Sequence, residues 1–134
     1  MRSQSLNLPL GQLEIEVLEH LWESGPADVK AVHAVLGRDQ RRSLNTVQST
    51  LDRLFRKQLL RREKVSRAYV YTPAIEREAL LVEAMGQIAE RLGARDSGAF
   101  MASFVKLAEQ DDPDNLDRLQ RLIDAQRVQR DSDE

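Results

Sequence analysis

A helix and a β-hairpin are predicted by residues 43–73, SLNTVQSTLDRLFRKQLLRREKVSRAYVYTP. Ser43 is a favourable N-cap, and apolar residues recur at helical spacing from there to about residue 57. The expected buried stripe consists of Leu44, Val47, Leu51, Leu54 and Phe55. The remaining side chains are small and uncharged at first and mostly basic further along, and we expect them to face outward.

The period of the apolar residues falls to two after this helix. Residues 59–65 and 68–72 have the composition of strands, and Ser66 and Arg67 separate them as a two-residue turn. Pro73 closes the segment. We therefore expect a β-hairpin whose tip carries positive charge.

Two shorter amphipathic helices are expected before this segment. Residues 12–24 place apolar side chains on one stripe and their glutamates, Glu14 included, largely off it, and a Gly-Pro pair stops the helix. Residues 28–36 form the second helix. The apolar faces comprise Leu13, Val17, Leu18, Leu21 and Trp22 in the first helix and Val29, Val32, Val35 and Leu36 in the second. Three helices followed by a basic hairpin outline a winged helix-turn-helix domain, which we assign to residues 1–73.

Residues 74–134 are expected to form a helical dimerisation domain, so the fold class is mainly α with one small hairpin. Helices are predicted over residues 75–92 and 97–110, and a third begins with Asp112 as its N-cap and frays from residue 128. Their apolar positions form a seam that seeks a partner helix. The predicted dimerisation residues are Leu81, Met85, Ile88, Leu92, Phe100, Phe104, Leu119 and Ile123. A segment of this size has marginal stability by itself, so we expect it to be completed by a second copy in a homodimer. Packing of the segment onto the first domain is the alternative.

The composition excludes several classes of protein. The 134 residues include no cysteine, which excludes disulfides, thiolate metal sites and a cysteine nucleophile. No apolar run approaches the roughly 18 to 20 residues that span a bilayer, and the N-terminus lacks a signal-peptide core, so we expect a cytoplasmic protein without membrane insertion. The glycine-rich phosphate and dinucleotide motifs and the hydrolase Gly-x-Ser-x-Gly motif are missing, so we predict neither catalysis nor a cofactor.

A histidine–carboxylate metal site is a weaker hypothesis. His20 has Glu16 and Glu23 within helical reach, and His33 on the next helix could complete the set. Neither histidine has the spacing of a metal-ligand motif, and a lone histidine on an amphipathic helix is usually structural. We therefore predict no metal site and keep a metal-responsive regulator as an alternative.

Charge is distributed unevenly along the chain. The formal net charge is −2, yet residues 38–67 hold ten Lys or Arg against three Asp or Glu, a local charge of +7. Such a patch attracts phosphates, and polar side chains at the start of a recognition helix reach base edges. We predict that Asn45, Gln48 and Ser49 read bases of double-stranded DNA. The predicted phosphate contacts are Arg41, Arg42, Thr46, Arg53, Arg56 and Arg67. The alternative is a winged domain that binds protein.

Residues 11–73 resemble the penicillinase and methicillin-resistance repressors of bacteria, the BlaI/MecI type. The similarity lies in LGQLEIEVLEHLWESGPADVKAVHAVL, in SLNTVQSTLDRLFRKQLLRREK and, most sharply, in RAYVYTP. The resemblance extends less tightly to residues 75–124, where SFVKLAEQDDPDNLDRLQRLID is similar to the dimerisation helices of the same family. Nearly the whole chain is covered, and the order and spacing of the motifs together make the resemblance specific.

The resemblance implies a homodimeric repressor that binds a dyad-symmetric operator through its third helix and wing. The family's base-reading positions fall on Asn45, Gln48 and Ser49, and Thr46 matches a phosphate contact. In β-lactam-responsive members, a membrane sensor protease triggers cleavage of an Asn-Phe bond in the dimerisation region. The corresponding bond here is Ser103–Phe104.

This chain departs from the family pattern in three places. Ser103 replaces the asparagine of the cleaved bond, so the resemblance alone does not imply proteolytic induction. A copper-responsive branch uses C-terminal cysteine ligands that this chain lacks, which excludes copper–thiolate sensing. Gln58 and Ser66 stand where many relatives have glycine, so we expect both at positive φ.

Overall fold

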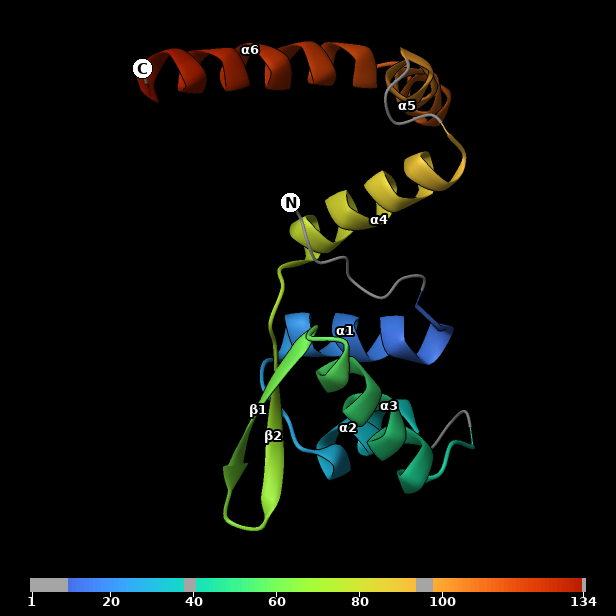
Figure 1. The fold of residues 1–134 in the computed structure, drawn as a ribbon, viewed down its shortest axis with the longest axis vertical. Helices are drawn as coiled ribbons and strands as arrows, with labels where there is room; N and C mark the ends of the chain where they lie inside the picture. Colours follow the sequence, from blue (N-terminus) through green and yellow to red (C-terminus); the bar gives the residue numbers. More distant parts are fainter. Residues whose placement is uncertain (1–9, 38–40, 94–97, 134) are drawn as a thin grey trace. The chain divides into compact units, whose positions relative to one another are not determined.

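The computed structural model describes residues 10–37, 41–93 and 98–133. Its elements in chain order are α1 (Gln12–Ser24), α2 (Val29–Leu36), α3 (Leu44–Arg56), β1 (Leu60–Val65), β2 (Ala68–Pro73), α4 (Arg77–Arg91), α5 (Gly98–Asp111) and α6 (Asn115–Asp133) (Figure 1). This order confirms the predicted class, in which three helices precede a small hairpin and further helices follow it.

The chain divides into two compact units, Met1–Gln87 and Ile88–Glu134. The division falls within α4 because the beginning of this helix packs on the first unit. Ile75 and Leu80 lie against its apolar core, and the indole N–H of Trp22 donates to the carbonyl oxygen of Ile75 at 2.9 Å. Our boundary after residue 73 marks the end of the hairpin instead, and it stays a prediction.

Side-chain caps fix the starts of two helices in the first unit. The Asp28 carboxylate accepts from the Ala31 N–H at 2.9 Å, and the Ser43 hydroxyl accepts from the Thr46 N–H at 3.0 Å. Each cap satisfies a backbone donor that the first turn of a helix would leave unpaired. The predicted N-cap of α3 is therefore confirmed, and the start of the helix that carries the candidate site is defined.

The core of the first unit lies between its helices and the hairpin. It consists of Val17, Leu18 and Leu21 from α1, Val32 from α2, Val47, Leu51 and Leu54 from α3, and Leu59, Leu60 and Tyr71 from the hairpin. Other predicted apolar residues are partly buried and pack against this core, namely Leu13, Trp22, Val29, Leu36 and Phe55. Leu44 and Val35 do not, because they are 41% and 56% exposed. Leu44 is on the predicted apolar face of α3, but it is the first residue of the helix, where the helix no longer packs against the core.

Two polar residues in the described part of the chain are buried, although neither was predicted to be. Thr50 is fully buried, three residues after Val47 on the same face of α3, and its hydroxyl donates to the Thr46 carbonyl at 2.9 Å. Glu14, which we placed off the stripe of α1, is 5% exposed. It precedes Val17 by three residues and so shares the inward face, where ion pairs compensate for its burial.

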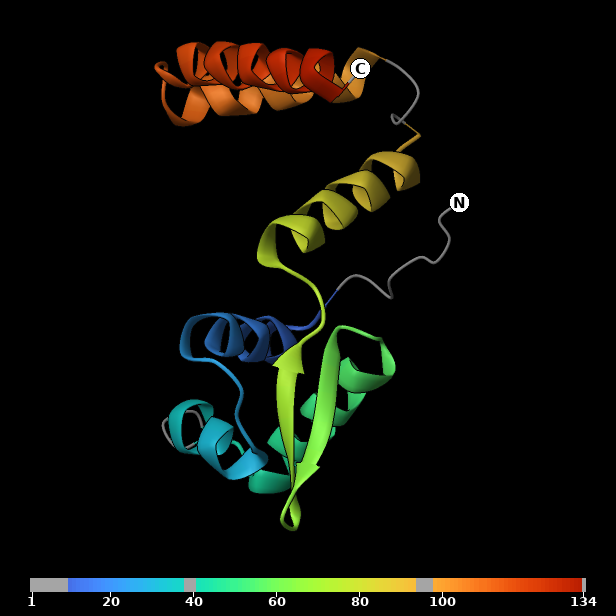
Figure 2. The same cartoon turned by 90° about the vertical axis from the view of Figure 1, so that its left-hand side faces the viewer.

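The hairpin is antiparallel, with Leu60 opposite Pro73, Arg62 opposite Tyr71 and Val65 opposite Ala68. Gln58 has φ 70° and Ser66 has φ 61°, as predicted. An isolated bridge joins Ala27, in the connector between α1 and α2, to Tyr71 through N–H···O bonds of 2.8 and 3.2 Å. Figure 2 shows this connector running beside β2. The hairpin is thereby fixed to the helices by backbone hydrogen bonds.

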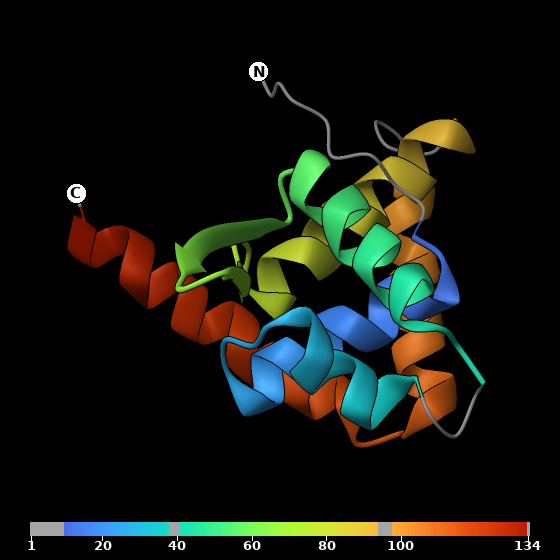
Figure 3. The same cartoon turned by 90° about the horizontal axis from the view of Figure 1, so that it is seen from below.

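The second unit contains α5 and α6, which meet at the corner formed by Asp112–Asp114 (Figure 3). The Asn115 side-chain amide donates to the Ala108 carbonyl at 2.8 Å across this corner. α6 begins at Asn115, and the Asp112 side chain accepts from the Asp114 N–H at 3.0 Å, which caps the turn that leads into the helix. The expected fraying from residue 128 is wrong, since α6 continues to Asp133.

No helix in the described ranges is long and apolar enough to cross a membrane.

Candidate nucleic-acid interface

The exposed face of α3 presents the three residues that we assigned to base reading. Asn45, Gln48 and Ser49 are all exposed, while Val47 and Leu51 between and after them are fully buried. The burial of these two apolar residues fixes the rotation of the helix. The structure therefore brings the predicted base-reading residues together on one polar surface within the first two turns.

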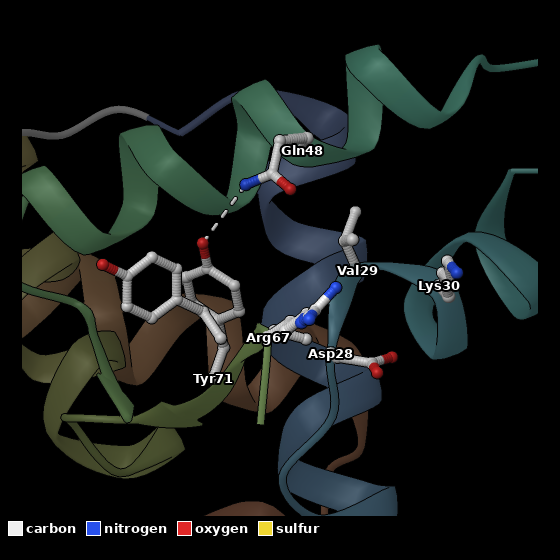
Figure 4. Close-up of a pocket in the computed structure, with 8 residues that line it drawn as sticks. Asp28, Val29, Lys30, Gln48, Arg67 and Tyr71 are labelled. Carbon is white, nitrogen blue, oxygen red and sulfur yellow. Dashed lines mark hydrogen bonds between the residues drawn. The ribbon is translucent and has the colours of Figure 1, made fainter. Parts of the chain in front are cut away.

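A groove of about 370 Å³ lies in front of Gln48, between α3, the start of α2 and the hairpin (Figure 4). It is lined by Asp28, Val29, Lys30, Gln48, Arg67, Ala68, Tyr69 and Tyr71. In Figure 4 the Gln48 side chain extends from α3 toward the Tyr71 hydroxyl, and Arg67 reaches toward Val29. Gln48 Nε2 donates to the Tyr71 hydroxyl at 3.3 Å. One predicted base-reading residue and one predicted phosphate contact thus line the same groove.

Four more of the predicted phosphate contacts are exposed. Arg41 and Thr46 lie at the entry to α3. Arg53 is 56% exposed, although its Nε lies 3.7 Å from a Glu14 oxygen. Arg56 is 77% exposed and pairs with Asp52 of the preceding turn at 3.1 Å. The exposed Arg56–Asp52 pair contributes little to stability, so Arg56 can exchange its carboxylate partner for a phosphate. Arg53 can do the same because the buried Glu14 carboxylate keeps Lys57 as its closer partner, at 2.7 Å.

Arg42 is different, because its guanidinium is used within the domain. Its side chain is 20% exposed, and its Nη1 donates to Glu16 at 2.8 Å and to the Leu36 carbonyl at 3.2 Å. Its own carbonyl oxygen lies 2.9 Å from His33 Nε2. The hydrogen bond from Arg42 lowers the pKa of Glu16. Arg42 therefore ties α1 and α2 to the entry of α3, a role that the sequence did not reveal.

A buried ion pair connects the two ends of the helical layer. Lys57 Nζ lies 2.7 Å from Glu14 Oε2, and the Gly11 N–H donates to the other carboxylate oxygen at 2.8 Å. Burial opposes ionisation of Glu14, but the hydrogen bonds from Lys57 and Gly11 and the charges of Lys57 and Arg53 outweigh it and lower its pKa. Glu14 is thus held ionised beneath the basic end of α3.

Arg62 holds the hairpin against α3. Its guanidinium lies 3.9 Å from the Phe55 ring centroid and 4.1 Å from that of Tyr69, and it pairs with Asp52 at 3.3 Å. A guanidinium over an aromatic face is attracted by the negative charge density of the ring, so both stacking contacts favour this position of Arg62. The sequence did not predict this contact, because the alternating pattern of apolar and polar residues in the strands does not show which residue of α3 packs against Arg62.

The histidine–carboxylate hypothesis finds no support in the described part of the chain, which contains no group of three or more potential metal ligands. His33 Nε2 is occupied by the Arg42 carbonyl, and His20 is half-buried on α1. His33 thus contributes a contact between α2 and the entry of α3.

Three helices, a hairpin fixed to their core and an exposed polar face on the third helix define a winged-helix DNA-binding domain. The solved DNA-binding domain of the repressor BlaI has the same fold, with a TM-score of 0.51 and 28% sequence identity over 57% of this chain and 93% of that domain. A family model for the penicillinase repressor matches residues 10–125. The chain belongs to the penicillinase repressor family.

Sequence relatives agree with this assignment. The transcriptional regulator BlaI of Mycobacterium tuberculosis, in strains CDC 1551 / Oshkosh and ATCC 25618 / H37Rv, is 34% identical over 119 residues, which cover 85% of this chain and 82% of the relative. The protein is therefore a DNA-binding transcriptional repressor and not an enzyme.

Proposed function

We propose that the protein represses transcription as a homodimer on a dyad-symmetric operator. The observation that carries this proposal is the apolar surface of the C-terminal helices. No residue of α5 or α6 is buried, although their apolar side chains include Phe104, Ile123 and Leu107. A helical unit with so much exposed apolar surface is unstable alone, and a second copy is the simplest cover for it.

The predicted dimerisation residues support this surface to different degrees. Leu81, Ile88, Leu92, Phe104 and Ile123 are exposed. Met85, Phe100 and Leu119 are half-buried within the single chain. Contiguous exposed apolar patches on soluble proteins mark interaction sites, so the first group would be covered by the partner subunit.

Each subunit would place α3 in a major groove. Asn45, Gln48 and Ser49 would then bond base edges, with Asn and Gln suited to adenine. Thr46, Arg41, Arg53, Arg56 and Arg67 would bond phosphates and set the position of the helix. We omit Arg42 from this group because it is ion-paired within the domain. Two subunits would bind half-sites about 10 base pairs apart, or an integral multiple of that spacing.

Induction would follow from loss of the dimer, because each subunit alone would hold a single half-site. A membrane sensor protease could cause this loss by cutting Ser103–Phe104, since the bond lies within α5 and both residues are exposed. The cut would divide the helix that carries much of the apolar surface. Because the proposed target is promoter DNA, we assign the protein to the cytoplasm.

Footprinting of the DNA upstream of the gene tests the proposal. We expect two protected half-sites related by a dyad, and protection that weakens steeply as salt increases. Sedimentation of the free protein should show a dimer. Absence of protection even in dilute buffer would favour the protein-binding winged domain, and a monomer on DNA would exclude the dimeric mechanism.

A further inference from the structure

We propose that Tyr71 is a positioning residue for base reading, whose hydroxyl holds the amide of Gln48 in one orientation for an adenine. The inference rests on the proposed function, because it assumes that Gln48 reaches a base. It adds a buried residue of the hairpin to the specificity of the recognition helix. Neither the helix face nor the charge pattern points to this residue.

Tyr71 is fixed more firmly than its neighbours on the hairpin. It is 1% exposed, and its ring belongs to the core of the first unit. Its backbone is bonded in both directions to Ala27, and its strand pairs it with Arg62. Because the ring is closely packed in the core, any other rotamer of Tyr71 would leave a cavity where the ring now lies. Its hydroxyl therefore occupies a defined position at the edge of the groove.

The hydroxyl connects this fixed ring to an exposed side chain. Gln48 Nε2 donates to it at 3.3 Å, as Figure 4 shows. Arg62, the residue opposite Tyr71 on the neighbouring strand, is itself held by Asp52 at 3.3 Å. Because Gln48 is the exposed member, it is the residue whose freedom the contact restricts. Exposed glutamine otherwise samples many rotamers.

The orientation matches the chemistry of an adenine. A glutamine that reads adenine uses its amide oxygen as acceptor and an N–H as donor. The amide of Gln48 has two N–H groups, and the bond to Tyr71 uses one of them. The oxygen and the second N–H stay available. Ordering the side chain before binding removes part of the entropic cost of ordering it on DNA.

The test compares Tyr71→Phe with the wild type on a duplex selected by the wild-type protein from a random-sequence library. Affinities are measured for that duplex and for all its single-base-pair substitutions. We expect Tyr71→Phe to weaken binding to the selected duplex about three- to tenfold, the range expected for freeing one side chain. The loss should be concentrated at the base pair whose preference also changes in Gln48→Ala. Binding to an unrelated duplex should stay unchanged.

A double variant and a matched control separate this effect from a change in folding. In the Gln48→Ala background, Tyr71→Phe should cause no further loss. Thr72→Val removes a hydroxyl from the next position of the same strand, outside the groove, and should leave the preference at that base pair intact. Thermal unfolding of each variant shows whether the domain is still folded at the temperature of the binding assay.

The outcomes distinguish the inference from the function on which it rests. If Gln48→Ala changes no base preference, Gln48 does not read bases, and both the assignment and the inference fall. If Gln48→Ala changes one preference but Tyr71→Phe does not, only the inference is overturned. An equal effect of Tyr71→Phe with and without Gln48 would likewise overturn it, since the hydroxyl would then act through another residue.

Discussion

The ammonium group of Lys57 lies 2.7 Å from the carboxylate of Glu14, so that the end of α3 is ion-paired with the start of α1. Both side chains are largely buried, at 16% and 7% exposure. A pair in this setting is weak evidence for net stabilisation, but removal of one partner leaves the other charge uncompensated. The consequence is measurable in a single substitution.

Glu14→Gln should lower the free energy of unfolding by about 1–3 kcal/mol, because Lys57 would keep its charge without a buried counter-ion. Urea denaturation measures the change. Glu19→Gln is the matched control, since Glu19 is exposed on the same helix and its substitution should change stability by less than about 0.5 kcal/mol. Equal stability of the two variants would contradict the structural role of Glu14.

Stability should also fall in acid. Glu14 and Glu16 have pKa values below the usual 4.5, owing to the hydrogen bonds and charges described above. A carboxyl whose pKa is lower in the folded state contributes stability above its unfolded pKa, and that stability is lost as pH falls through the folded value. Unfolding measured downward from pH 5 should show a decline that begins near 4.5 and is shallower in Glu14→Gln.

Gln48→Ala and Arg67→Ala should affect DNA binding in different ways. Loss of a base contact should weaken discrimination at one base pair by about 1–3 kcal/mol, whereas loss of a phosphate contact should weaken all sequences alike and reduce the salt slope by about 1. Binding titrations at several salt concentrations, on the selected duplex and its substitutions, separate the two effects. A uniform loss in Gln48→Ala would contradict base reading.

Arg41 and Arg42, which precede α3, should respond differently to substitution by alanine. Arg42→Ala should destabilise the domain by about 1–2 kcal/mol, because it removes charge-assisted bonds to Glu16 and Leu36. Arg41→Ala should leave stability unchanged and weaken DNA binding. Chemical denaturation and DNA titration of both variants test the assignment, and the reverse pattern would restore Arg42 as a phosphate contact.

Ile88→Asp should dissociate the dimer and release DNA, because it places a charge in the exposed apolar surface of α4, where Ile88 is 59% exposed. Sedimentation equilibrium measures the dimer, and DNA titration measures the release. Gln126→Asp introduces the same charge at an exposed polar position of α6 and should preserve both properties. A dimer that persisted in Ile88→Asp would place the subunit contact elsewhere.

Local sequence signals predicted the elements of the first unit well. The cap at Ser43, the hairpin turn and the positive φ of Gln58 and Ser66 depend on residues close in the chain, and each is confirmed. The exposed face of α3 follows from its apolar period in the same way. The burial of Leu44 was predicted wrongly because periodicity defines a face of a helix and not how far along it the core extends.

Contacts between distant residues could not be predicted in this way. Glu14 and Lys57 are 43 residues apart, and Gln48 and Tyr71 are 23 apart. The apolar pattern alone places Glu14 outside the core, because only its contact with Lys57 explains how a carboxylate can be buried there. The stacking of Arg62 between Phe55 and Tyr69 depends on how the hairpin crosses α3, which neither segment encodes alone.

The bridge between Ala27 and Tyr71 gives the hairpin a fixed pivot. Beyond this point, toward the Ser66–Arg67 turn, the described structure has no further backbone hydrogen bond from the hairpin to the helices. The length of this part therefore limits which phosphates Arg67 can reach. Lengthening the connector between α1 and α2, which contains Ala27, would therefore change the position of the Ser66–Arg67 turn on the DNA. It would do so without replacing any residue that faces the nucleic acid.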